Sequence, residues 1–394
     1  MKILHTVESY YPAPGGMAEV VRQISERLAR MGHSITVATS AHAARNELNL
    51  NGVTIIPFSI SGAMTRSIQG EIANYQSFLL NGDFDVIVNF AAQHWATDLM
   101  LPLLGQISAR KIFVPTGFSG LFQTEYQDYY KQMPEWMRQY DANIFLSETY
   151  RDRQFARQHN ISNCFLISNG ASEEEFLSKP ETDIRNILGI DKDELLVLHV
   201  GSHTGLKGHY EAINIFKQSR LKNAVLLIIG NALEQGGCMK SCQRQEWLSR
   251  FSPLQQMRKK RVMIMELSRK ETVAAYQAAD LFLFPSRIEC SPIVLFECAA
   301  SKTPFLATPA GNTQEIIEWM GGGMLLPSQQ NANGEVQAHI STSARMLEDV
   351  ASNPVRRRAM SDKAFSAWKQ KFTWAQIARE YARVYQSVLS GNVA

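Results

Sequence analysis

The chain has 394 residues, of which 45% are hydrophobic and 20% charged, enough for two compact domains with apolar cores. The 40 Lys and Arg residues nearly balance the 37 Asp and Glu residues, which argues against a dedicated nucleic-acid-binding protein. No apolar run approaches the roughly 18 residues of a membrane span. We therefore expect a cytoplasmic protein whose only membrane contact is peripheral, at the inner face.

The first half of the chain alternates strands with helices. Residues 3–7 form a predicted strand, and a loop rich in Pro and Gly separates it from a helix with Val20, Ile24 and Leu28 at helical spacing. Gly32 is placed to end this helix in a left-handed conformation. Further strands are expected at residues 34–39, 85–89 and 112–115.

The second half restarts the same alternation after residues 167–176, whose turn residues and acidic run predict a linker. Two of its helices begin with the sequence of a capping box, Ser268 with Glu271 and Asn312 with Glu315. The chain is therefore predicted to form two doubly wound, Rossmann-like α/β domains that face a cleft, with ligands beyond the carboxyl ends of the strands. The strands of the second half are expected at residues 195–200, 224–229, 262–265, 281–284 and 304–308.

A glycine-rich loop follows the first strand. Gly15 and Gly16 lie just before the first helix, where glycine lets backbone approach a ligand and the helix N-terminus offers free N–H groups. The loop lacks the G-x-G-x-x-G pattern of dinucleotide enzymes, which disfavours hydride transfer with NAD. It predicts contact with an anionic ligand, and a plain tight turn is the alternative.

The loop after residues 195–200 carries a lysine among glycines. Gly201, Ser202, Lys207 and Gly208 lie at the expected carboxyl edge of the second sheet, where a lysine suits a phosphate. The order of residues is not that of a Walker loop. Taken alone, Lys207 is equally typical of a solvated surface.

A helix start is readable after residues 281–284. Ser291 suits the N-cap and Pro292 the first helical position. The free N–H groups near Ile293 and Val294 would then point toward a diphosphate.

Two carboxylates flank this helix start. Glu289 lies in the loop before the helix, and Glu297 lies inside it among apolar neighbours, where a buried carboxylate needs a partner. Two carboxylates beside an anion site suit the hydroxyl groups of a sugar. A solvated Glu297 is the alternative.

Together these motifs resemble those of retaining glycosyltransferases of family 4, which have the GT-B fold. The resemblance covers nearly the whole chain. It implies an acceptor-side domain over residues 1–172, completed by a C-terminal helix over 373–394, and a nucleotide-sugar-binding domain over 190–372. The residues that carry it are Glu289-x7-Glu297, Gly15-Gly16, Lys207-Gly208, Ser168-Asn169-Gly170, and Phe372-Thr373-Trp374 with Ala378, Tyr381 and Tyr385.

The resemblance implies a role for each loop. Glu297 would hold the ribose of the nucleotide, and Glu289 would contact hydroxyls of the transferred sugar. Lys207 and the amides at the start of the following helix would hold the leaving diphosphate, and Gly16 would approach the donor. The expected donor-binding residues are Gly15, Gly16, Gly201, Ser202, Lys207, Ser291, Pro292, Ile293, Val294 and Glu297.

Two positions depart from the family pattern. Ser202 stands where the family commonly has an arginine, so that phosphate contact is either missing or supplied elsewhere, with Arg287 as the candidate. Residues 116–120 stand where the family tends to have a histidine. His94, after the strand at 85–89, is the candidate substitute, and a structural histidine is the alternative. The expected catalytic residues are Lys207, Glu289 and His94.

The implied function is transfer of a sugar from a nucleoside-diphosphate sugar to a glycan or lipid-linked acceptor, with retention of anomeric configuration, in cell-surface polysaccharide synthesis. Two other functions stay open: an epimerase or hydrolase of nucleotide sugars on the same fold, and a non-catalytic nucleotide-sugar-binding subunit. Aromatic residues between 126 and 140 and the basic run 258–261 are candidate membrane contacts, with solvated faces as the alternative.

We expect no cofactor and no metal ion. Asp83-Phe84-Asp85 matches a D-x-D metal motif of another glycosyltransferase fold, but it precedes a strand and so lies at the wrong edge of the sheet. Cys238 and Cys242 are followed by no histidine or second cysteine pair at zinc-site spacing, and the five cysteines are expected to be reduced thiols. The leaving group would then be neutralised by lysine and by helix amides.

Overall fold

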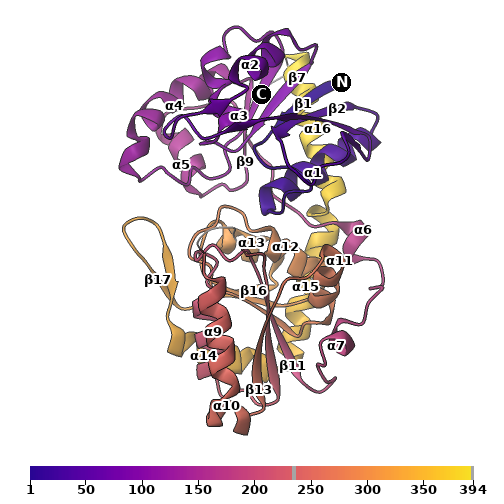
Figure 1. Ribbon diagram of the computed structural model, residues 1–394, viewed down its shortest axis with the longest axis vertical. Coiled ribbons are helices and arrows are strands. Elements are labelled where there is room, and N and C mark those ends of the chain that lie inside the picture. The colour runs from indigo at the N-terminus through magenta and orange to yellow at the C-terminus, as the bar shows by residue number, and fades with distance from the viewer. Residues whose placement is uncertain (233–236, 392–394) are drawn as a thin grey trace. The chain divides into compact units, whose positions relative to one another are not determined.

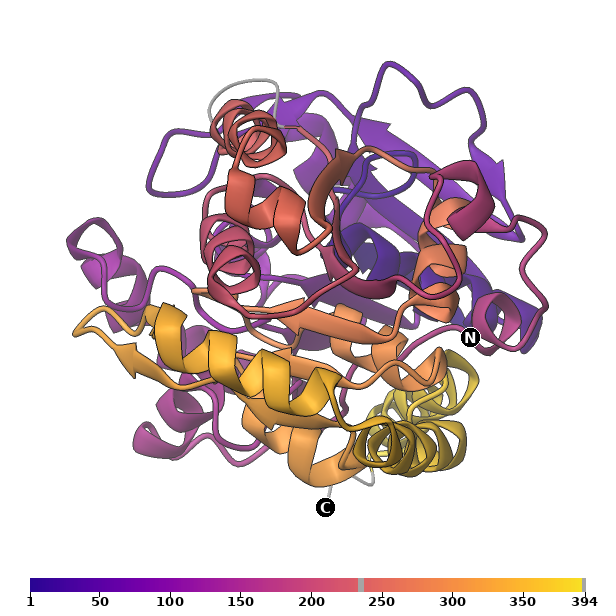
Figure 2. The ribbon, with the colours of Figure 1, turned by 90° about the horizontal axis from the view of Figure 1, so that it is seen from below.

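The computed structural model describes residues 1–232 and 237–391, and these divide into two units. Unit 1 comprises Met1–Asn169 together with the C-terminal segment from Trp374, and unit 2 comprises Gly170–Thr373. Each unit has a mainly parallel β-sheet with helices on both faces (Figures 1 and 2). Within the described residues, no helix combines the length and the apolar character needed to cross a membrane.

The unit 1 sheet has eight strands in the order β10-β9-β8-β7-β1-β2-β4-β3, and only β3 pairs antiparallel with its neighbour. The direction of winding reverses between β1 and β7, which is where doubly wound domains bind ligands. The strands are β1 (Lys2–Thr6), β2 (Ser34–Ser40), β3 (Asn49–Leu50), β4 (Val53–Phe58), β7 (Val86–Phe90), β8 (Arg110–Val114), β9 (Ala142–Phe145) and β10 (Cys164–Leu166); a separate hairpin holds β5 (Ile60–Ser61) and β6 (Gln69–Gly70).

The C-terminal helix α16 (Trp374–Ser390) packs against α1 (Gly16–Arg30) in unit 1, and Figure 1 shows it in yellow beside α1. Beneath them the buried ring of His5 lies 2.8 Å from Ser25 Oγ and 3.2 Å from the hydroxyl of Tyr385. This network ties the end of the chain to its first strand. The other helices of unit 1 are α2 (Ile72–Asn81), α3 (Trp95–Asp98), α4 (Gln127–Gln139) and α5 (Arg151–Gln158).

The unit 2 sheet is parallel throughout, with the order β13-β12-β11-β14-β15-β16. Its winding reverses between β11 and β14, so the loops after these strands mark its ligand edge. Alternate residues reach opposite faces: Leu196 and Leu198 join one apolar cluster and Val197 joins the other. The strands are β11 (Leu195–Val200), β12 (Ala224–Ile229), β13 (Lys260–Met265), β14 (Leu281–Phe284), β15 (Phe305–Ala307) and β16 (Gly323–Leu325).

Helices α8 and α14 cover one face of this sheet, and α11, α12, α13 and α15 cover the other (Figure 2). The helices of unit 2 are α6 (Glu173–Phe176), α7 (Ile184–Ile187), α8 (His209–Gln218), α9 (Met239–Arg250), α10 (Pro253–Met257), α11 (Arg269–Ala278), α12 (Ile293–Ala300), α13 (Thr313–Met320), α14 (Ile340–Ala351) and α15 (Pro354–Lys371); a hairpin joins β17 (Ser328–Gln330) to β18 (Val336–Ala338).

Local predictions had mixed outcomes. Ser268 and Glu271 form the predicted capping box, whereas Asn312 occupies the N-cap of α13 without a side-chain cap hydrogen bond. Helix α12 begins at Ile293 with Pro292 at the N-cap, one residue later than predicted, so the prediction of Ser291 as N-cap was wrong.

The candidate membrane contacts are exposed only in part. Between residues 126 and 140 the aromatic side chains of Tyr126, Tyr129, Tyr130 and Tyr140 are buried in the core of unit 1, so they present no exposed face. Within the basic run 258–261, Lys260 is buried with its ammonium on backbone carbonyl groups, and Arg261 pairs with Glu194.

Candidate active site

Two loops meet at the point where the winding of the unit 2 sheet reverses. Residues 201–208 follow β11 and residues 285–292 follow β14. The amide of Arg287 donates to the carbonyl oxygen of Leu206 at 2.8 Å. Gly208 has φ 75°, and a Cβ there would overlap the carbonyl oxygen of Pro285. Glycine is therefore required for the close approach of the two loops.

This contact brings Lys207 and Glu289 together. Lys207 Nζ lies 2.8 Å from Glu289 Oε1, and the hydroxyl of Ser286 donates to the same oxygen at 2.7 Å. The lysine side chain is 30% exposed and the glutamate side chain 9% exposed. The ammonium can therefore reach an anion at the sheet edge, while the carboxylate is held in place by two donors.

The N-terminus of α12 follows directly after these loops. In its first turn the amide of Leu295 donates to the carbonyl oxygen of Pro292 at 3.2 Å, while the amides of Ile293 and Val294 lie before the first regular helical hydrogen bond and carry partial positive charge toward the same edge of the sheet. Ser291 and Pro292 are buried, and Ile293 and Val294 are half-buried. The loop after β15 supports this turn, because the amide of Asn312 donates to the carbonyl oxygen of Cys290 at 2.8 Å.

Glu297 is a buried member of an ion-pair network. It is 3% exposed, so the alternative of a solvated residue is wrong. Its Oε1 lies 2.6 Å from Arg269 Nη1, and Arg269 Nη2 lies 2.6 Å from Glu175 Oε2. Burial raises the pKa of Glu297, and the guanidinium of Arg269 opposes this rise. The partner that a buried carboxylate needs is thus supplied from α11.

The carboxyl edge of the unit 1 sheet holds Gly15 and His94. Gly15 has φ 143° at the N-cap of α1, and both Gly15 and Gly16 are exposed. His94 follows β7 and is 8% exposed, and its Nε2 lies 2.8 Å from the carbonyl oxygen of Phe90. Nε2 therefore carries the proton, and Nδ1 has no partner among the described residues. Burial lowers the pKa of His94 to about 4.

Comparison with known families decides what kind of protein carries these loops. Residues 14–175 match the family model described as Glycosyltransferase Family 4, and residues 180–354 match the model described as Glycosyl transferases group 1. The two matches together span most of the chain. The chain is a glycosyltransferase with a family 4 domain followed by a group 1 domain. The family resemblance inferred from the sequence motifs is thereby confirmed.

Known proteins resemble this glycosyltransferase over its full length. An uncharacterized glycosyltransferase of Methanocaldococcus jannaschii, MJ1607, is 24% identical over 98% of both chains. Sucrose-phosphate synthase of Thermosynechococcus elongatus has a TM-score of 0.79 at 19% identity, covering 99% of each chain. Anabaena Alr3699/HepE in complex with UDP and glucose has a TM-score of 0.76 at 17% identity, covering 98% of this chain and 100% of that one. These likenesses confirm the GT-B fold.

Arg287 was the candidate to supply the phosphate contact that Ser202 cannot make, but its guanidinium is bound to another side chain. Its Nη2 lies 2.9 Å from Glu335 Oε2, next to β18, so its guanidinium is already paired. The D-x-D match lies at the amino edge of the unit 1 sheet, because Asp85 accepts a hydrogen bond at 2.7 Å from the amide of Lys2 at the start of β1. Its predicted placement away from the ligand edge is confirmed.

Sequence reasoning missed two buried carboxylates that shape the unit 1 edge. Asp98 accepts hydrogen bonds from the amide of Met64 at 2.8 Å and from the hydroxyl of Tyr129 at 2.9 Å. Asp152 accepts from the amide of Gly117 at 2.8 Å. Burial raises the pKa of each aspartate to about 6. Neither was recognisable in the sequence, because an aspartate near a predicted helix is ordinarily a solvated residue.

The loops that these aspartates hold contain strained backbone. Four residues other than glycine have positive φ after β7 and β8. Such conformations cost free energy and concentrate where a fixed loop shape serves a ligand. The four residues are Ala91 (65°), Gln93 (66°), Thr116 (57°) and Phe118 (47°).

Proposed function

We propose that this glycosyltransferase transfers a sugar from a nucleoside-diphosphate sugar to a lipid-linked or glycan acceptor, with retention of anomeric configuration and without a metal ion on the diphosphate. The observation that carries the proposal is the pair Lys207 and Glu289 beside the N-terminus of α12. An ammonium and helix amides suit a diphosphate, and a carboxylate suits sugar hydroxyls. The UDP complex of Anabaena Alr3699/HepE supports this donor class.

In the proposed reaction the bond between the anomeric carbon and the diphosphate oxygen breaks, and negative charge develops on the leaving phosphate. Lys207 and the amides of α12 stabilise this charge more than that of the bound donor, which lowers the barrier. The acceptor oxygen bonds to the anomeric carbon on the face that the phosphate leaves, and the phosphate takes the hydroxyl proton. This front-face course accounts for retention without a protein nucleophile.

The remaining predicted residues have proposed positions around the same donor. Glu289 would accept hydrogen bonds from hydroxyls of the transferred sugar. Glu297 would hold the ribose of the nucleotide. Gly15, Gly16 and His94 of unit 1 would contact the donor and the acceptor, and Nδ1 of a neutral His94 would accept a hydrogen bond.

Substitution of Lys207 tests the proposal. Lys207→Ala should lower kcat by roughly 10²–10³-fold, because one fixed donor to the developing charge is lost. Lys222→Ala removes an exposed lysine of the same unit, and it should leave turnover unchanged. Near-normal turnover in Lys207→Ala would contradict the assignment.

Product analysis separates the proposal from the functions left open by the sequence. The purified chain is screened for thermal stabilisation by nucleoside-diphosphate sugars, and the best donor is then incubated with and without acceptors. A transferase releases nucleoside diphosphate in step with a glycosylated acceptor. Nucleotide or isomerised donor formed equally well without an acceptor indicates a hydrolase or an epimerase. Donor binding without turnover indicates a binding subunit.

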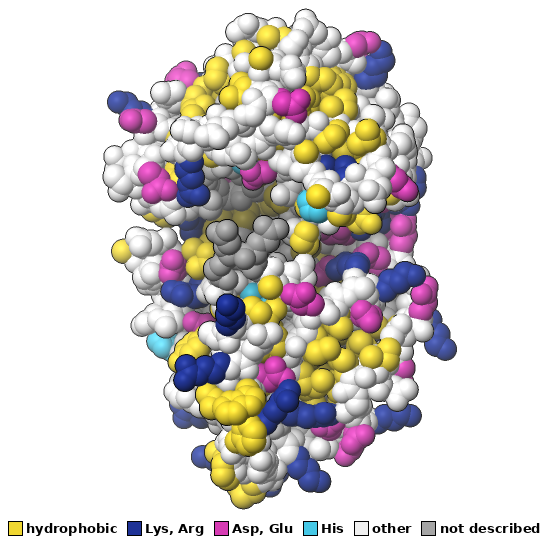
Figure 3. Space-filling view, viewed as in Figure 1, with side chains coloured by type: hydrophobic (Ala, Val, Ile, Leu, Met, Phe, Trp, Pro, Cys, Tyr) yellow, Lys and Arg dark blue, Asp and Glu magenta, His cyan; other side chains and the backbone are white. Residues whose placement is uncertain are grey.

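A lipid-linked acceptor is favoured by an exposed surface on α9 and α10. Trp247, Phe251 and Met257 are 57%, 63% and 76% exposed, and Figure 3 shows hydrophobic side chains gathered over these helices with Lys and Arg beside them. Large apolar side chains flanked by basic residues suit an anionic membrane surface. We therefore place the proposed peripheral membrane contact here.

Vesicle cosedimentation at low salt tests this contact. The chain should bind vesicles that contain anionic lipid, and Trp247→Ser combined with Phe251→Ser should weaken binding at least several-fold. Phe122→Ser is the matched control, because Phe122 is 58% exposed on unit 1. Equal binding by all three proteins, or no binding by any of them, would contradict a membrane contact at α9 and α10.

A further inference from the structure

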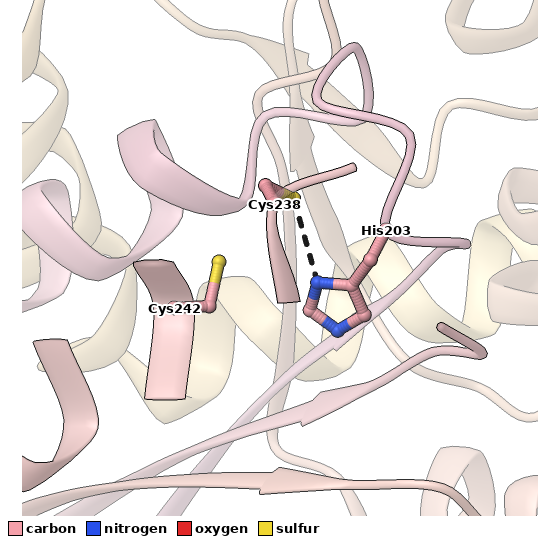
Figure 4. A group of neighbouring side chains, drawn as sticks. All are labelled: His203, Cys238 and Cys242. Atoms are coloured by element: carbon pink, nitrogen blue, oxygen red, sulfur yellow. Dashed lines mark hydrogen bonds between the residues drawn. The ribbon is translucent and has the colours of Figure 1, made fainter. Parts of the chain in front are cut away.

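Three side chains that can bind a metal ion lie together at one side of the unit 2 sheet, as Figure 4 shows. His203 lies in the loop after β11, Cys238 immediately precedes α9, and Cys242 lies in the first turns of that helix. Their ligand atoms all lie within 4.8 Å of one another. His203 is 0% exposed and Cys242 is 1% exposed, so the cluster is largely shielded from water.

The spacing of sulfur and nitrogen atoms in this cluster is that of a zinc site. Cys238 Sγ lies 3.4 Å from His203 Nδ1 and 3.6 Å from Nδ1 of the neighbouring His209. With Zn–S about 2.3 Å and Zn–N about 2.0 to 2.1 Å, tetrahedral geometry separates a sulfur and a nitrogen ligand by about 3.5 Å. His203 and Cys238 therefore need little movement to bind a common ion. His209 is not one of the three residues whose ligand atoms all lie within 4.8 Å of one another, so its ring, which stacks on that of His203, has to turn toward the ion.

The orientation of His209 supports the same reading. Its Nε2 donates to the carbonyl oxygen of Gly201 at 3.0 Å, which leaves Nδ1 with a lone pair directed toward Cys238. Metal-binding histidines usually hold the other ring nitrogen in this way. The Nδ1 of the buried His203 also faces Cys238, while its Nε2 has no partner among the described residues.

The backbone already fixes the two segments against each other. The amide of Cys238 donates to the carbonyl oxygen of His203 at 3.0 Å, and the amide of Cys242 donates to the carbonyl oxygen of Cys238 at 2.9 Å. The two cysteines are thus one helical turn apart on one face. The partial positive charge at the N-terminus of α9 favours the thiolate form that binds metal.

We propose that His203, Cys238 and Cys242 bind one Zn²⁺, with His209 as the fourth ligand. Thiolate and imidazole in tetrahedral arrangement select zinc, and four protein ligands leave no open position for a substrate. The role is structural: the ion would tie the loop that carries Lys207 to α9.

This proposal departs from the sequence expectation that the Cys238 and Cys242 pair binds no metal. That expectation considered only zinc motifs in which histidines or a second cysteine pair follow the first pair at a characteristic spacing. Here the histidines precede Cys238 in the chain, His203 by 35 residues and His209 by 29. They reach it only because β11 and β12 are neighbours in the sheet.

Metal content of the purified chain tests the proposal directly. The chain is incubated with Zn²⁺, freed of excess metal by gel filtration, and analysed by mass spectrometry of the element. Wild type should retain about one zinc per chain. Cys238→Ser and Cys242→Ser should lose it, and His209→Ala should bind more weakly. Cys164→Ser is the control, because it removes a thiol of unit 1 and should leave the zinc content unchanged.

A second measurement avoids variants that fail to fold. Wild type reconstituted with Co²⁺ should show the intense visible absorption of a tetrahedral site and a thiolate-to-metal charge-transfer band. Zinc should also protect Cys238 and Cys242 from alkylation, and a chelator should remove that protection. Wild type without stoichiometric metal, zinc retained by both serine variants, or a disulfide between Cys238 and Cys242 in place of the ion would each overturn the proposal.

The effect of zinc on residues 201–208, the loop that carries Lys207, is a separate readout. Zinc removal should lower the melting temperature and raise the KM for the donor more than it lowers kcat, because the ion positions the loop and does not touch the reacting atoms. The metal measurements require no transferase activity. Their failure is therefore distinguishable from a failure of the proposed function.

Discussion

Lys207 Nζ lies 2.8 Å from Glu289 Oε1, so the cation proposed for the diphosphate is already paired with the carboxylate proposed for the sugar. Ser286 donates to the same carboxylate oxygen, which keeps Glu289 in place when the lysine moves. A partly exposed ion pair of this kind contributes little to stability. An incoming diphosphate therefore competes with Glu289 for Lys207, and the two residues should respond differently to substitution.

Glu289→Gln should separate binding from turnover. Loss of the competing carboxylate frees Lys207, so nucleoside diphosphate should bind about threefold more tightly, as expected for a weak ion pair. Turnover should fall roughly tenfold or more, because an amide accepts sugar hydroxyls more weakly than a carboxylate. Calorimetry with nucleoside diphosphate and steady-state kinetics measure the two effects. Glu318→Gln, at an exposed position of unit 2, is the control, and weaker diphosphate binding in Glu289→Gln would contradict the competition.

Two glycines in the loop of residues 201–208 offer a matched test of its contact with the loop of residues 285–292. Gly205 and Gly208 have φ values of 84° and 75°, so alanine at either position should cost about 1–2 kcal/mol for a left-handed backbone. No atom lies within 4 Å of a Cβ at Gly205, whereas a Cβ at Gly208 would overlap the carbonyl oxygen of Pro285. Gly208→Ala should therefore unfold at lower denaturant concentration than Gly205→Ala. Only Gly208→Ala should also lose donor affinity, and equal effects on affinity would contradict the role of this loop contact.

The sequence predicted much of the unit 2 site because three strands are continuous apolar runs. β11, β12 and β14 have the bounds expected for them, and their order follows from the doubly wound pattern. Once β11 and β14 are neighbours, the loops that carry Lys207 and Glu289 must meet. The proximity of these two residues could thus be predicted from the hydrophobic pattern and the sheet topology.

Side-chain partners that lie on distant helices or strands could not be predicted from the sequence. Arg269 reaches Glu297 from α11, and no spacing in the sequence connects them. The aromatic residues near α4 were misjudged because charged neighbours suggested a surface, whereas Tyr129 and Tyr130 point inward. Short strands such as β9 and β10 gave no run long enough to recognise. Burial of a polar residue is a property of the fold, and the sequence shows it only indirectly.

The pair of Arg269 and Glu297 should behave as a coupled unit. Arg269→Gln leaves a buried carboxylate without its guanidinium partner, and Glu297→Gln keeps the pair of Arg269 with Glu175. A double-mutant cycle should give a coupling free energy of about 1–3 kcal/mol from denaturant unfolding. Additive effects would mean that the pair contributes nothing. Donor binding measured on Glu297→Gln shows in parallel whether the same side chain contacts the ribose.

His94 should make the stability of unit 1 depend on pH. In the unfolded chain it takes up a proton below its ordinary pKa of 6.5, whereas burial holds the pKa in the folded chain at about 4. The unfolded state therefore binds more protons between these values, and the free energy of unfolding falls as pH falls from 6.5 to 4. At about 1.4 kcal/mol for each pKa unit, His94 contributes at most about 3.5 kcal/mol to this fall.

His94→Gln tests that contribution through the slope of the free energy of unfolding against pH, and not through the free energy at any one pH. Asp98 and Asp152 have raised pKa values of about 6, so they act in the opposite direction as pH falls, and they do so equally in wild type and variant. Denaturant unfolding at several pH values should therefore give a shallower loss of stability below pH 6.5 in His94→Gln. Parallel slopes would show that His94 has the same pKa in the folded chain as in the unfolded chain, which would contradict the lowered pKa. In that case Nδ1 of His94 would serve as a hydrogen-bond acceptor only above pH 6.5, because a protonated ring donates at both nitrogens.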